Sequence, residues 1–572
     1  MSRFAQLFAE RLAPVVELPA EQLRGQIGAP PRPELGHLAF GCFALAKSRR
    51  AAPAAIAQQI AGQVATGGGL LAVSADGPYV NARLDGAEVA RAVLTGVRAA
   101  GARFGTCDLG RGGVVPVDFS SPNIAKPFAI HHLRSTVIGH ALIGLLSAAG
   151  YEPVGINHLG DWGTQFGALL AVWEQTGDEA RLQREGIHYL LELYVEFNRR
   201  KEADPSLQET ARAKFKALED GEPRARRLWQ LFRDVSLREF ERVYALLGIR
   251  FDDVRGESAF ESLMPAVLDE LQARGLLVES EDATVVDLSA RGLGAALLRK
   301  RDGSTLYLTR DLAAADYRWR TYGFARALYV VGAAQSLHFA QMKAVLELLG
   351  REWAGRVEHV PFGLMRFKDR KMASRTGDVV LLEEVLERAV ALARQTIERG
   401  AAERGRPVPA DADELAHRIG VGAVVFNDLK NRRVRDVVFD WDEVLSFEGE
   451  TGPYLQYTAA RIASLADKYG REPPAEVEWA RLAGEGETAL ALAIDALPDS
   501  LVAAVAEAEP SLVADRLLDI AARFSTLYAR RDWTVVSDDP ALTDARMLLA
   551  SATRQALVNG LTWLGIPVPD RM

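Results

Sequence analysis

Two adjacent histidines, His131 and His132, are the first residues in the chain whose type and setting suit chemistry. They follow a loop that Pro122 and Pro127 stiffen, and they precede apolar residues that recur at helical spacing over residues 133–150. The spacing therefore predicts that both histidines lie at the N-terminus of a helix, where unpaired backbone N–H groups and the helix dipole favour phosphate. The same pattern also fits a strand-to-helix connection whose histidines only cap the helix.

A second candidate loop covers residues 158–167, directly after the apolar run 153–157. It contains three glycines together with an acidic residue, Asp161, a threonine and a glutamine. Open α/β sheets bind ligands at the carboxyl ends of their strands, and this loop would end a second strand of the same sheet. We therefore favour a ligand loop over the alternative, a glycine-rich turn around a core residue, Trp162.

Two further groups of polar residues stand later in the chain. Tyr307, Asp311 and Asp316 lie near the start of a helical pattern and are expected to line one pocket. The segment 365–377 carries four basic residues close to a glycine, namely Lys368, Arg370, Lys371 and Arg375. A basic loop beside a nucleotide site would stabilise charge on a transferring phosphate. Taken alone, an ordinary solvated charge run is the better explanation of this segment.

The elements that must position these residues alternate between strands and helices from Val114 onward. This alternation predicts a parallel sheet built from βαβ units. The strands are predicted at residues 113–118, 153–157, 284–288, 297–309, 327–332 and 357–363, the fourth of them turning at Asp302-Gly303. Charged, amphipathic residues at 177–248 interrupt the alternation and predict an inserted helical subdomain.

The two ends of the chain have patterns of their own. Near the start, helices are predicted at 4–13, where Pro14 stops or kinks the first of them, and at 53–64, and a strand at 79–84. These elements form either an added binding module or a packing domain. Beyond about residue 388 the pattern predicts helices and no strands. Basic and aromatic residues there suit an RNA loop, whose bases stack on aromatic side chains, or equally a bundle with a dimer face.

Length and composition limit the class of protein. A chain of 572 residues is too long for one core and suggests three or four domains. Its 48% hydrophobic and 25% charged residues are typical of a soluble globular protein, and no uninterrupted apolar run reaches about 20 residues. Charges interrupt the N-terminal apolar residues, which argues against a signal peptide. Two cysteines suit a reducing compartment, and the net charge of −8 argues weakly against indiscriminate binding of nucleic acid.

Four passages make the chain resemble a known family, the class I arginyl-tRNA synthetases. They are residues 120–136 (SSPNIAKPFAIHHLRST), 157–167 (NHLGDWGTQFG), 306–313 (LYLTRDLA) and 447–457 (FEGETGPYLQY). The resemblance runs over essentially the whole chain in the family's order. It implies an α/β catalytic domain with a Rossmann-type parallel sheet, an N-terminal α+β additional domain that touches the tRNA elbow, and a C-terminal all-α anticodon-binding domain. We place the catalytic domain at residues 109–387, with a helical insertion at about 177–250. The N-terminal additional domain covers residues 1–108, and the anticodon-binding domain covers residues 388–572.

The resemblance also implies a reaction. L-arginine and ATP would form arginyl-adenylate and pyrophosphate, and the arginyl group would then pass to the terminal adenosine of tRNA(Arg). Members of the family generally need tRNA present for the first step. ATP would act with Mg²⁺, and no structural zinc is expected. The family implies a monomer in the cytoplasm that does not bind a membrane.

Site residues follow from the resemblance by position. The catalytic residues would be His131, His132, Lys371 and Arg375. ATP would contact Ser121, Pro122, Asn123, Lys126, His132, Gly160, Asp161, Lys371 and Met372. Arginine would contact Asp118, Asn123, Tyr307, Asp311 and Gln335, and tRNA would contact Arg435, Tyr454, Tyr457 and Met572. We expect Asp311 to bind the guanidinium group, because acidic side chains offer it planar acceptors.

The chain departs from the family at two motifs. The first class I motif, His-Ile/Val-Gly-His in most relatives, is Ala129-Ile-His-His132 here, so the first histidine is absent and His131 replaces the glycine. The second, Lys-Met-Ser-Lys-Ser, is Lys371-Met-Ala-Ser-Arg375, in which Ala373 lacks a hydroxyl. These departures leave open a paralogue that adenylates arginine or a related amino acid for an acceptor other than tRNA. A non-enzymatic RNA-binding relative is a further alternative.

Overall fold

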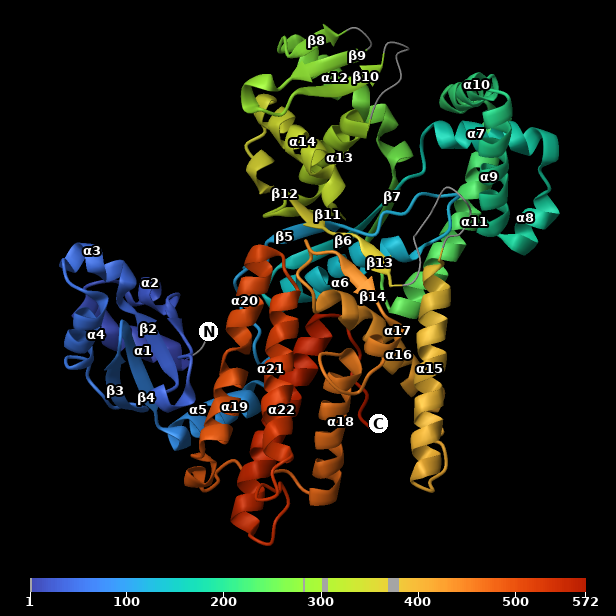
Figure 1. Ribbon diagram of the computed structural model, residues 1–572. Helices are drawn as coiled ribbons and strands as arrows, with labels where there is room; N and C mark the ends of the chain where they lie inside the picture. Colours follow the sequence, from blue (N-terminus) through green and yellow to red (C-terminus); the bar gives the residue numbers. More distant parts are fainter. Residues whose placement is uncertain (1–2, 281–282, 301–306, 369–379, 572) are drawn as a thin grey trace.

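The N-terminal part of the chain is an antiparallel sheet covered by helices. The computed structural model describes residues 3–280, 283–300, 307–368 and 380–571 (Figure 1). Its first helices are α1 (Arg3–Val16), α2 (Ala20–Arg24), α3 (Ala46–Arg49), α4 (Pro53–Ala61) and α5 (Gly86–Ala100). Its strands are β1 (Ile27–Gly28), β2 (Leu38–Gly41), β3 (Leu70–Asp76) and β4 (Tyr79–Leu84), in the order β1-β2-β4-β3.

Sequence patterns predicted several of these elements well. β4 has the predicted bounds, and α4 begins at the predicted residue but ends at Ala61 instead of residue 64. Of the two effects predicted for Pro14, that it stops or kinks the first helix, the stop is wrong, because α1 continues to Val16. A proline in the last turn removes only one backbone hydrogen bond, so it does not prevent the helix from finishing. The sequence analysis did not predict α5, the amphipathic helix that follows the sheet.

A five-stranded parallel sheet forms the centre of the molecule (Figure 1). Its strands are β5 (Val114–Asp118), β6 (Glu152–Leu159), β7 (Asp253–Gly256), β11 (Ala327–Gly332) and β12 (Val357–Phe362). They lie in the order β12-β11-β5-β6-β7, so the chain reverses its direction of strand addition between β5 and β11. This is the Rossmann-type arrangement, and its ligand crevice lies outside the carboxyl ends of the two strands at the reversal.

One helix, α6 (Leu133–Ala148), is buried along most of its length. It packs on β5, β6 and β11 on one side and on C-terminal helices on the other. Its sequence is therefore apolar nearly all round, as a fully enclosed helix requires. The predicted helix over residues 133–150 is confirmed, and its N-terminus, which follows the two histidines, meets the carboxyl edge of the sheet.

A helical insertion separates β6 from β7. It consists of α7 (Thr164–Thr176), α8 (Glu179–Glu185), α9 (Ile187–Ala203), α10 (Leu207–Glu219) and α11 (Pro223–Leu247). The helical subdomain predicted over residues 177–248 is confirmed, and it is preceded by α7, which begins at Thr164.

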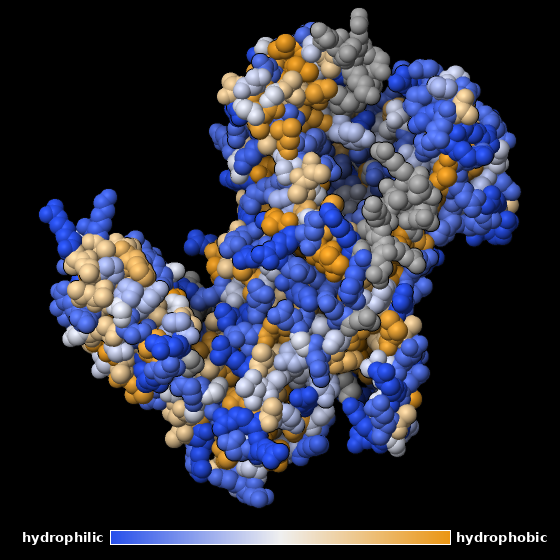
Figure 2. Space-filling view, viewed as in Figure 1, coloured by the Kyte–Doolittle hydropathy of each residue, from blue (hydrophilic) through white to orange (hydrophobic). Residues whose placement is uncertain are grey.

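The chain between β7 and β12 forms a second, smaller subdomain. It comprises α12 (Met264–Ala273), β8 (Leu277–Ser280), β9 (Ala283–Asp287), β10 (Ala295–Lys300), α13 (Tyr307–Tyr322) and α14 (Ser336–Leu348). In Figure 2 hydrophobic residues gather on part of this subdomain, and Val278 and Leu297 are among its exposed apolar side chains.

Two predictions about this subdomain are wrong. The central sheet does not resume at 284–288, because β8, β9 and β10 form an antiparallel sheet of their own in the order β10-β9-β8. The predicted strand 297–309 does not reach its end, because α13 already begins at Tyr307. The predicted turn at Asp302-Gly303 lies outside the described residues. The fifth strand of the central sheet, β7, was not predicted at all.

The C-terminal part is helical. Its helices are α15 (Leu382–Glu403), α16 (Ala412–Leu429), α17 (Trp441–Val444), α18 (Gly452–Tyr469), α19 (Glu485–Asp495), α20 (Leu497–Glu507), α21 (Ser511–Tyr528) and α22 (Pro540–Trp563). The prediction that strands end near residue 388 is wrong, because β14 (Val437–Phe439) pairs in parallel with β13 (Met365–Phe367). The pair ties the chain just after the central sheet to a loop between C-terminal helices. Residues 485–507 pass a length-and-composition test for a membrane span, but they form two helices, α19 and α20, that pack on α21.

Candidate active site

The loop between β5 and α6 has an unusual backbone. Ser120, Ser121 and Ala125 all adopt left-handed conformations, with φ of 69°, 48° and 61°. Residues other than glycine pay a steric cost in this region, and such strain persists only where the surroundings enforce it. Here the loop is held by hydrogen bonds to α6 and to the inserted helix α11, so its shape is imposed by the tertiary structure.

Buried hydroxyl groups provide those hydrogen bonds. Ser120 Oγ lies 2.8 Å from both Thr136 Oγ1 on α6 and the Tyr244 hydroxyl on α11. The Ala125 backbone N–H donates to Ser236 Oγ of α11 at 2.8 Å. Asn157, near the end of β6, donates to the same Tyr244 hydroxyl at 3.1 Å. The helical insertion therefore supports the candidate ligand loop from behind.

The two histidines form a 3-10 turn that leads directly into α6. His132 Nδ1 lies 3.1 Å from the Ala129 backbone N and 3.2 Å from the Ala129 backbone oxygen, so it accepts from the N–H or donates to the carbonyl according to the tautomer. Burial is the main cause that lowers the pKa of His132 to about 3, and the neighbouring imidazole of His131 lowers it further. Phe128 stacks on His132 at 5.0 Å between centroids, and the two histidine rings lie 4.0 Å apart. His132 is thus a neutral imidazole at the helix mouth, and the predicted position of both histidines is confirmed.

The loops after β5 and β6 are joined to each other. The Gly160 N–H donates to the Pro122 oxygen at 3.1 Å, and the Ile124 N–H donates to the Gly160 oxygen at 3.2 Å. An added Cβ at position 160 would lie 2.0 Å from Asn123 Oδ1, so a larger residue there would have to displace the Asn123 side chain. The Asn123 amide therefore crosses directly over Gly160, and both residues lie at the carboxyl edge of the sheet.

Asp161 follows Gly160 directly, but its side chain is enclosed in the core. Its carboxylate is fully buried and accepts hydrogen bonds from the Ser258 N–H at 2.9 Å and from Ser258 Oγ at 2.8 Å. Gly256, at the end of β7, lies so close that a Cβ would come within 1.9 Å of Asp161 Oδ2. The side chain thus joins β6 to β7, and a contact between Asp161 and a ligand would have to come from its backbone. Trp162 is a core residue, 2% exposed.

Acidic side chains gather at the point where the strand order reverses. Asp118, the last residue of β5, accepts from Arg318 Nη2 at 2.7 Å and from Ser121 Oγ at 2.8 Å. Asp311, on α13, lies 2.6 Å from His338 Nε2 of α14. The charges of both carboxylates act on the buried imidazole of His158 and oppose the fall in its pKa that burial causes. Asp118 and Asp311 come from β5 and α13, which pack against each other, so both lie beside the space at the strand reversal.

The remaining predicted arginine contacts lie around this space or beside it. Gln335 is exposed in the turn after β11, and Tyr307 begins α13 with 61% of its side chain exposed. Asp316 does not join them, because it forms a bidentate ion pair with Arg351 at 2.8 Å for each contact. Lys371, Met372 and Arg375 lie outside the described residues. Lys126 contacts the ring of Tyr194 on the inserted helix α9, 5.4 Å from its centroid.

Three residues of this site were not singled out from the sequence, although one of them, His158, lies in the predicted loop 158–167. Glu257, just after β7, lies 3.1 Å from Arg310 Nη1, and burial is the main cause that raises the pKa of its carboxyl to about 8. His338 holds Asp311, and His158 Nδ1 is buried without a partner among the described residues. Buried groups with shifted pKa values, such as Glu257 and His158, are typical of functional sites. His338 stands three residues after Gln335. This is helical spacing, so the sequence could have indicated that the two residues lie close together.

The predicted tRNA contacts are divided between two places. Tyr454 and Tyr457 line a cavity of about 1180 Å³ between α15, α18 and α21, together with Phe447 and Arg461. The Arg461 guanidinium lies over the Tyr457 ring at 4.5 Å. Arg435 lies elsewhere, in the loop after α16, and Met572 is outside the described residues. The cavity lies in the helical part and not beside the central sheet.

Comparisons with known proteins agree with this architecture. The family model described as tRNA synthetases class I (R), catalytic domain, matches residues 103–441. The models described as Arginyl tRNA synthetase N terminal domain and DALR anticodon binding domain match residues 2–84 and 455–572.

Similar proteins cover the whole chain. A protein of Clostridium perfringens named arginine–tRNA ligase is 42% identical over 571 residues, with 100% of both chains covered. One of Limosilactobacillus fermentum with the same name is 44% identical, with 97% of each covered. The solved structure titled Thermus thermophilus arginyl-tRNA synthetase has a TM-score of 0.82 at 25% identity and covers 99% of each chain. The chain therefore belongs to the class I arginyl-tRNA synthetase family.

Proposed function

We propose that this protein joins L-arginine to tRNA(Arg) in protein synthesis, with ATP as the energy source and arginyl-adenylate as the intermediate. The observation that carries the proposal is the full-length identity of 42% to arginine–tRNA ligases, with all three family regions present in order. The geometry supports it, because an acidic pocket and a phosphate-compatible helix mouth lie at one edge of the sheet.

The chemistry is an in-line displacement at the α-phosphate of ATP. The carboxylate of arginine attacks the α-phosphorus, the bond to the leaving oxygen breaks, and pyrophosphate departs. A hydroxyl of the terminal ribose of tRNA then attacks the arginyl carbonyl carbon, and AMP leaves. Both steps depend chiefly on positioning and on stabilising charge, so no covalent nucleophile of the protein is needed.

The helix mouth would hold ATP. His132 offers a neutral imidazole, and the α6 N-terminus adds the positive end of its dipole. Ser121, Pro122, Asn123, Lys126, Gly160 and the Asp161 backbone complete the proposed ATP contacts, with His131, Lys371, Met372 and Arg375 from the two class I motifs. Mg²⁺ would enter with ATP on its phosphate oxygens. Among the described residues no cluster of three or more His, Cys, Asp or Glu side chains offers a protein-built metal site.

The acidic pocket would hold arginine. Asp311 and Asp118 are the charged acceptors for the guanidinium and ammonium groups, with Asn123, Tyr307 and Gln335 as further contacts. Both carboxylates already have cationic or imidazole partners, Arg318 and His338, which fix their orientation. A preoriented carboxylate binds a planar guanidinium with less loss of side-chain entropy, which supports selection of arginine by this pocket.

The helical part would hold the anticodon arm. Tyr454 and Tyr457 present aromatic faces to a cavity wide enough for unstacked bases, and Arg461 adds charge. Arg435 and Met572 remain proposed tRNA contacts. Action as a monomer in the cytoplasm, the division of the chain at residues 108 and 387, and the helical insertion at about 177–250 also belong to this proposal.

One set of assays tests the function. Arginine-dependent exchange of pyrophosphate into ATP is measured with and without tRNA, and charging of tRNA with labelled arginine follows. We expect exchange in the presence of tRNA, and charging. Exchange without charging under any condition would identify the paralogue with another acceptor. The absence of both activities from a folded protein that binds tRNA would identify an RNA-binding relative.

A further inference from the structure

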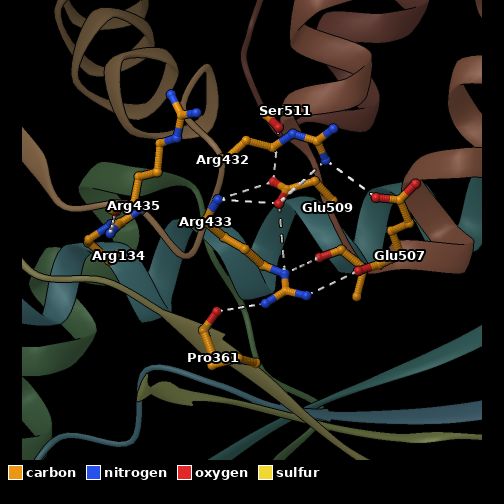
Figure 3. A network of polar contacts seen from close by, with 9 residues as sticks. Arg134, Pro361, Arg432, Arg433, Arg435, Glu507, Glu509 and Ser511 are labelled. Carbon is orange, nitrogen blue, oxygen red and sulfur yellow. Dashed lines mark hydrogen bonds and ion pairs between the residues drawn. The ribbon is translucent and has the colours of Figure 1, made fainter. Parts of the chain in front are cut away.

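A short loop between α16 and β14, residues 430–436, joins the central sheet to the C-terminal helices (Figure 3). The Arg433 guanidinium donates to three backbone oxygens, those of Pro361 at 2.7 Å, Ala508 at 3.1 Å and Glu507 at 3.3 Å. Pro361 belongs to the edge strand β12, whereas Glu507 and Ala508 end α20. One side chain therefore spans the boundary between the two parts.

The backbone of the same loop is fixed by a buried carboxylate. The Arg433 N–H donates to both oxygens of Glu509, at 3.2 and 3.3 Å, and Ser511 Oγ donates to Glu509 at 2.9 Å. Glu509 is 5% exposed. The Arg433 Nε–Glu509 Oε2 distance is 4.0 Å, longer than a hydrogen bond, so the guanidinium is held by neutral carbonyl groups. The Arg433 side chain is 17% exposed, and its hydrogen bonds to carbonyl groups of β12 and of the end of α20 place it to fix the relative position of the two.

This loop also contacts the start of α6, beside the helix mouth, and the turn between β12 and β13. On one side, Arg134 donates Nη1 to the Arg435 oxygen at 2.7 Å, and it stands two residues after His132. Its Nε donates to Asp428 Oδ2 at 2.8 Å, with both side chains no more than 1% exposed. On the other side, the Gly363 N–H donates to the Arg433 oxygen at 2.9 Å. From there the chain continues through β13 toward Lys371.

A second arginine makes a comparable bridge without these connections. Arg326 Nη1 donates to the Val505 oxygen of α20 at 2.8 Å, and its guanidinium forms a bidentate pair with Glu358 of β12 at 2.8 and 2.7 Å. It lies at the amino end of β11, on the side of the sheet opposite to the ligand crevice. Arg326 and Arg433 thus attach the same strand to the same helix. Of these two arginines, only Arg433 lies in the loop that contacts Arg134 and Gly363.

We propose that Arg433 is a positioning residue for arginine activation. By holding residues 430–436 between β12 and the end of α20, it sets the position of the His132 helix mouth relative to β13, the strand that pairs with β14. It touches no substrate and acts through Arg134 and Gly363. The inference rests on the proposed function, because it concerns the activation step of that reaction.

The test compares matched variants of the full-length enzyme in arginine-dependent pyrophosphate exchange at saturating tRNA. Arg433→Met keeps the aliphatic stem but removes every donor, and we expect kcat to fall about 10-fold or more. KM for ATP is expected to rise, while KM for arginine and the Kd for tRNA stay within about 2-fold. Arg433→Lys retains one charged donor and is expected to recover part of kcat. Arg326→Met is expected to lower the melting temperature with kcat and KM values near those of the wild type.

The outcomes are separable. Wild-type kcat in a folded Arg433→Met enzyme would overturn the inference, as would an equal loss of kcat in Arg326→Met. If Arg433→Met does not fold, the lysine variant decides, because a lysine enzyme with unchanged kcat and KM for ATP would also overturn it. If the wild-type enzyme itself shows no exchange, the proposed function fails instead.

Discussion

Replacing Gly160 by alanine tests the geometry of the candidate site at a single atom. The added methyl carbon would lie 2.0 Å from Asn123 Oδ1 and 2.9 Å from Asn123 Cγ. Non-bonded heavy atoms prefer separations of about 3.5 Å, so the amide oxygen must retreat by roughly 1.5 Å. Gly160 does not have a left-handed backbone, and the clash is with the end of a side chain. The substitution therefore displaces the Asn123 side chain without unfolding the loop.

The expected effect follows from what Asn123 is proposed to do. An off-rotamer or rotated amide costs about 0.5–1.5 kcal/mol, so the free energy of unfolding should change by only about that amount. A lost hydrogen bond to a charged group of arginine costs about 1.5–3 kcal/mol, which is an increase in KM for arginine of roughly 10-fold to 100-fold. The substitution should thus separate binding from stability.

Pyrophosphate exchange at varied arginine, together with thermal unfolding, measures both effects. Gly155→Ala, on β6 just before this loop, is the matched control, because its Cβ would meet nothing closer than 3.5 Å. Gly160→Ala combined with Asn123→Ala should be no worse than Asn123→Ala alone. An unchanged KM for arginine in folded Gly160→Ala enzyme would refute the reasoning, as would an equal effect of Gly155→Ala.

Three further predictions address other residues of the site. Asp311→Asn should raise KM for arginine at least about 100-fold, since it removes a charged acceptor, whereas Asp316→Asn, which disturbs only the Arg351 pair, should leave it unchanged in the same assay. Tyr244→Phe should lower the free energy of unfolding by about 1–3 kcal/mol in denaturant titration, because Ser120 loses a buried partner; no loss would mean that water replaces the hydroxyl. The pKa of His132 is lowered to about 3, so the unfolded chain binds its proton first as the pH falls below about 6.5. The melting temperature of the wild type should therefore fall more than that of His132→Gln between pH 7 and pH 5. If the two melting temperatures change in parallel with pH, the burial of this imidazole is contradicted.

The parts of the fold that could be predicted are those with strong local patterns. β11 has its predicted bounds because Ala327–Val331 is an uninterrupted apolar run that is buried on both faces. β7 was missed because Asp253-Val-Arg-Gly256 is short, polar and at the sheet edge. The start of α13 was misassigned because Tyr307 and Thr309 favour strands locally, yet Thr309 Oγ1 bonds the Leu298 oxygen of β10 at 2.6 Å and the segment is helical. Tertiary contacts outweighed propensity there.

Some features of the candidate site could likewise be predicted from local sequence patterns, whereas others could not. The loops after β5 and β6 could be predicted because glycines and prolines mark the ends of apolar runs. The burial of the Asp161 carboxylate against Ser258 could not, because its partner stands far along the chain. Glu257 was missed for the same reason, since nothing in its local sequence reveals that Arg310 will face it. Chemistry that depends on such distant pairs becomes visible only in three dimensions.

The buried pair of Arg134 and Asp428 has a practical consequence for dissecting this enzyme into fragments. A fragment that ends at residue 387 would retain Arg134 inside its core but lose Asp428 and the Arg435 oxygen. A buried charge left without its partner costs about 3–5 kcal/mol, a large share of the stability of a typical domain. It would also lose β14 and expose the open side of β13. A catalytic fragment meant to fold alone should therefore extend through Phe439, and a split enzyme should be cut after that strand.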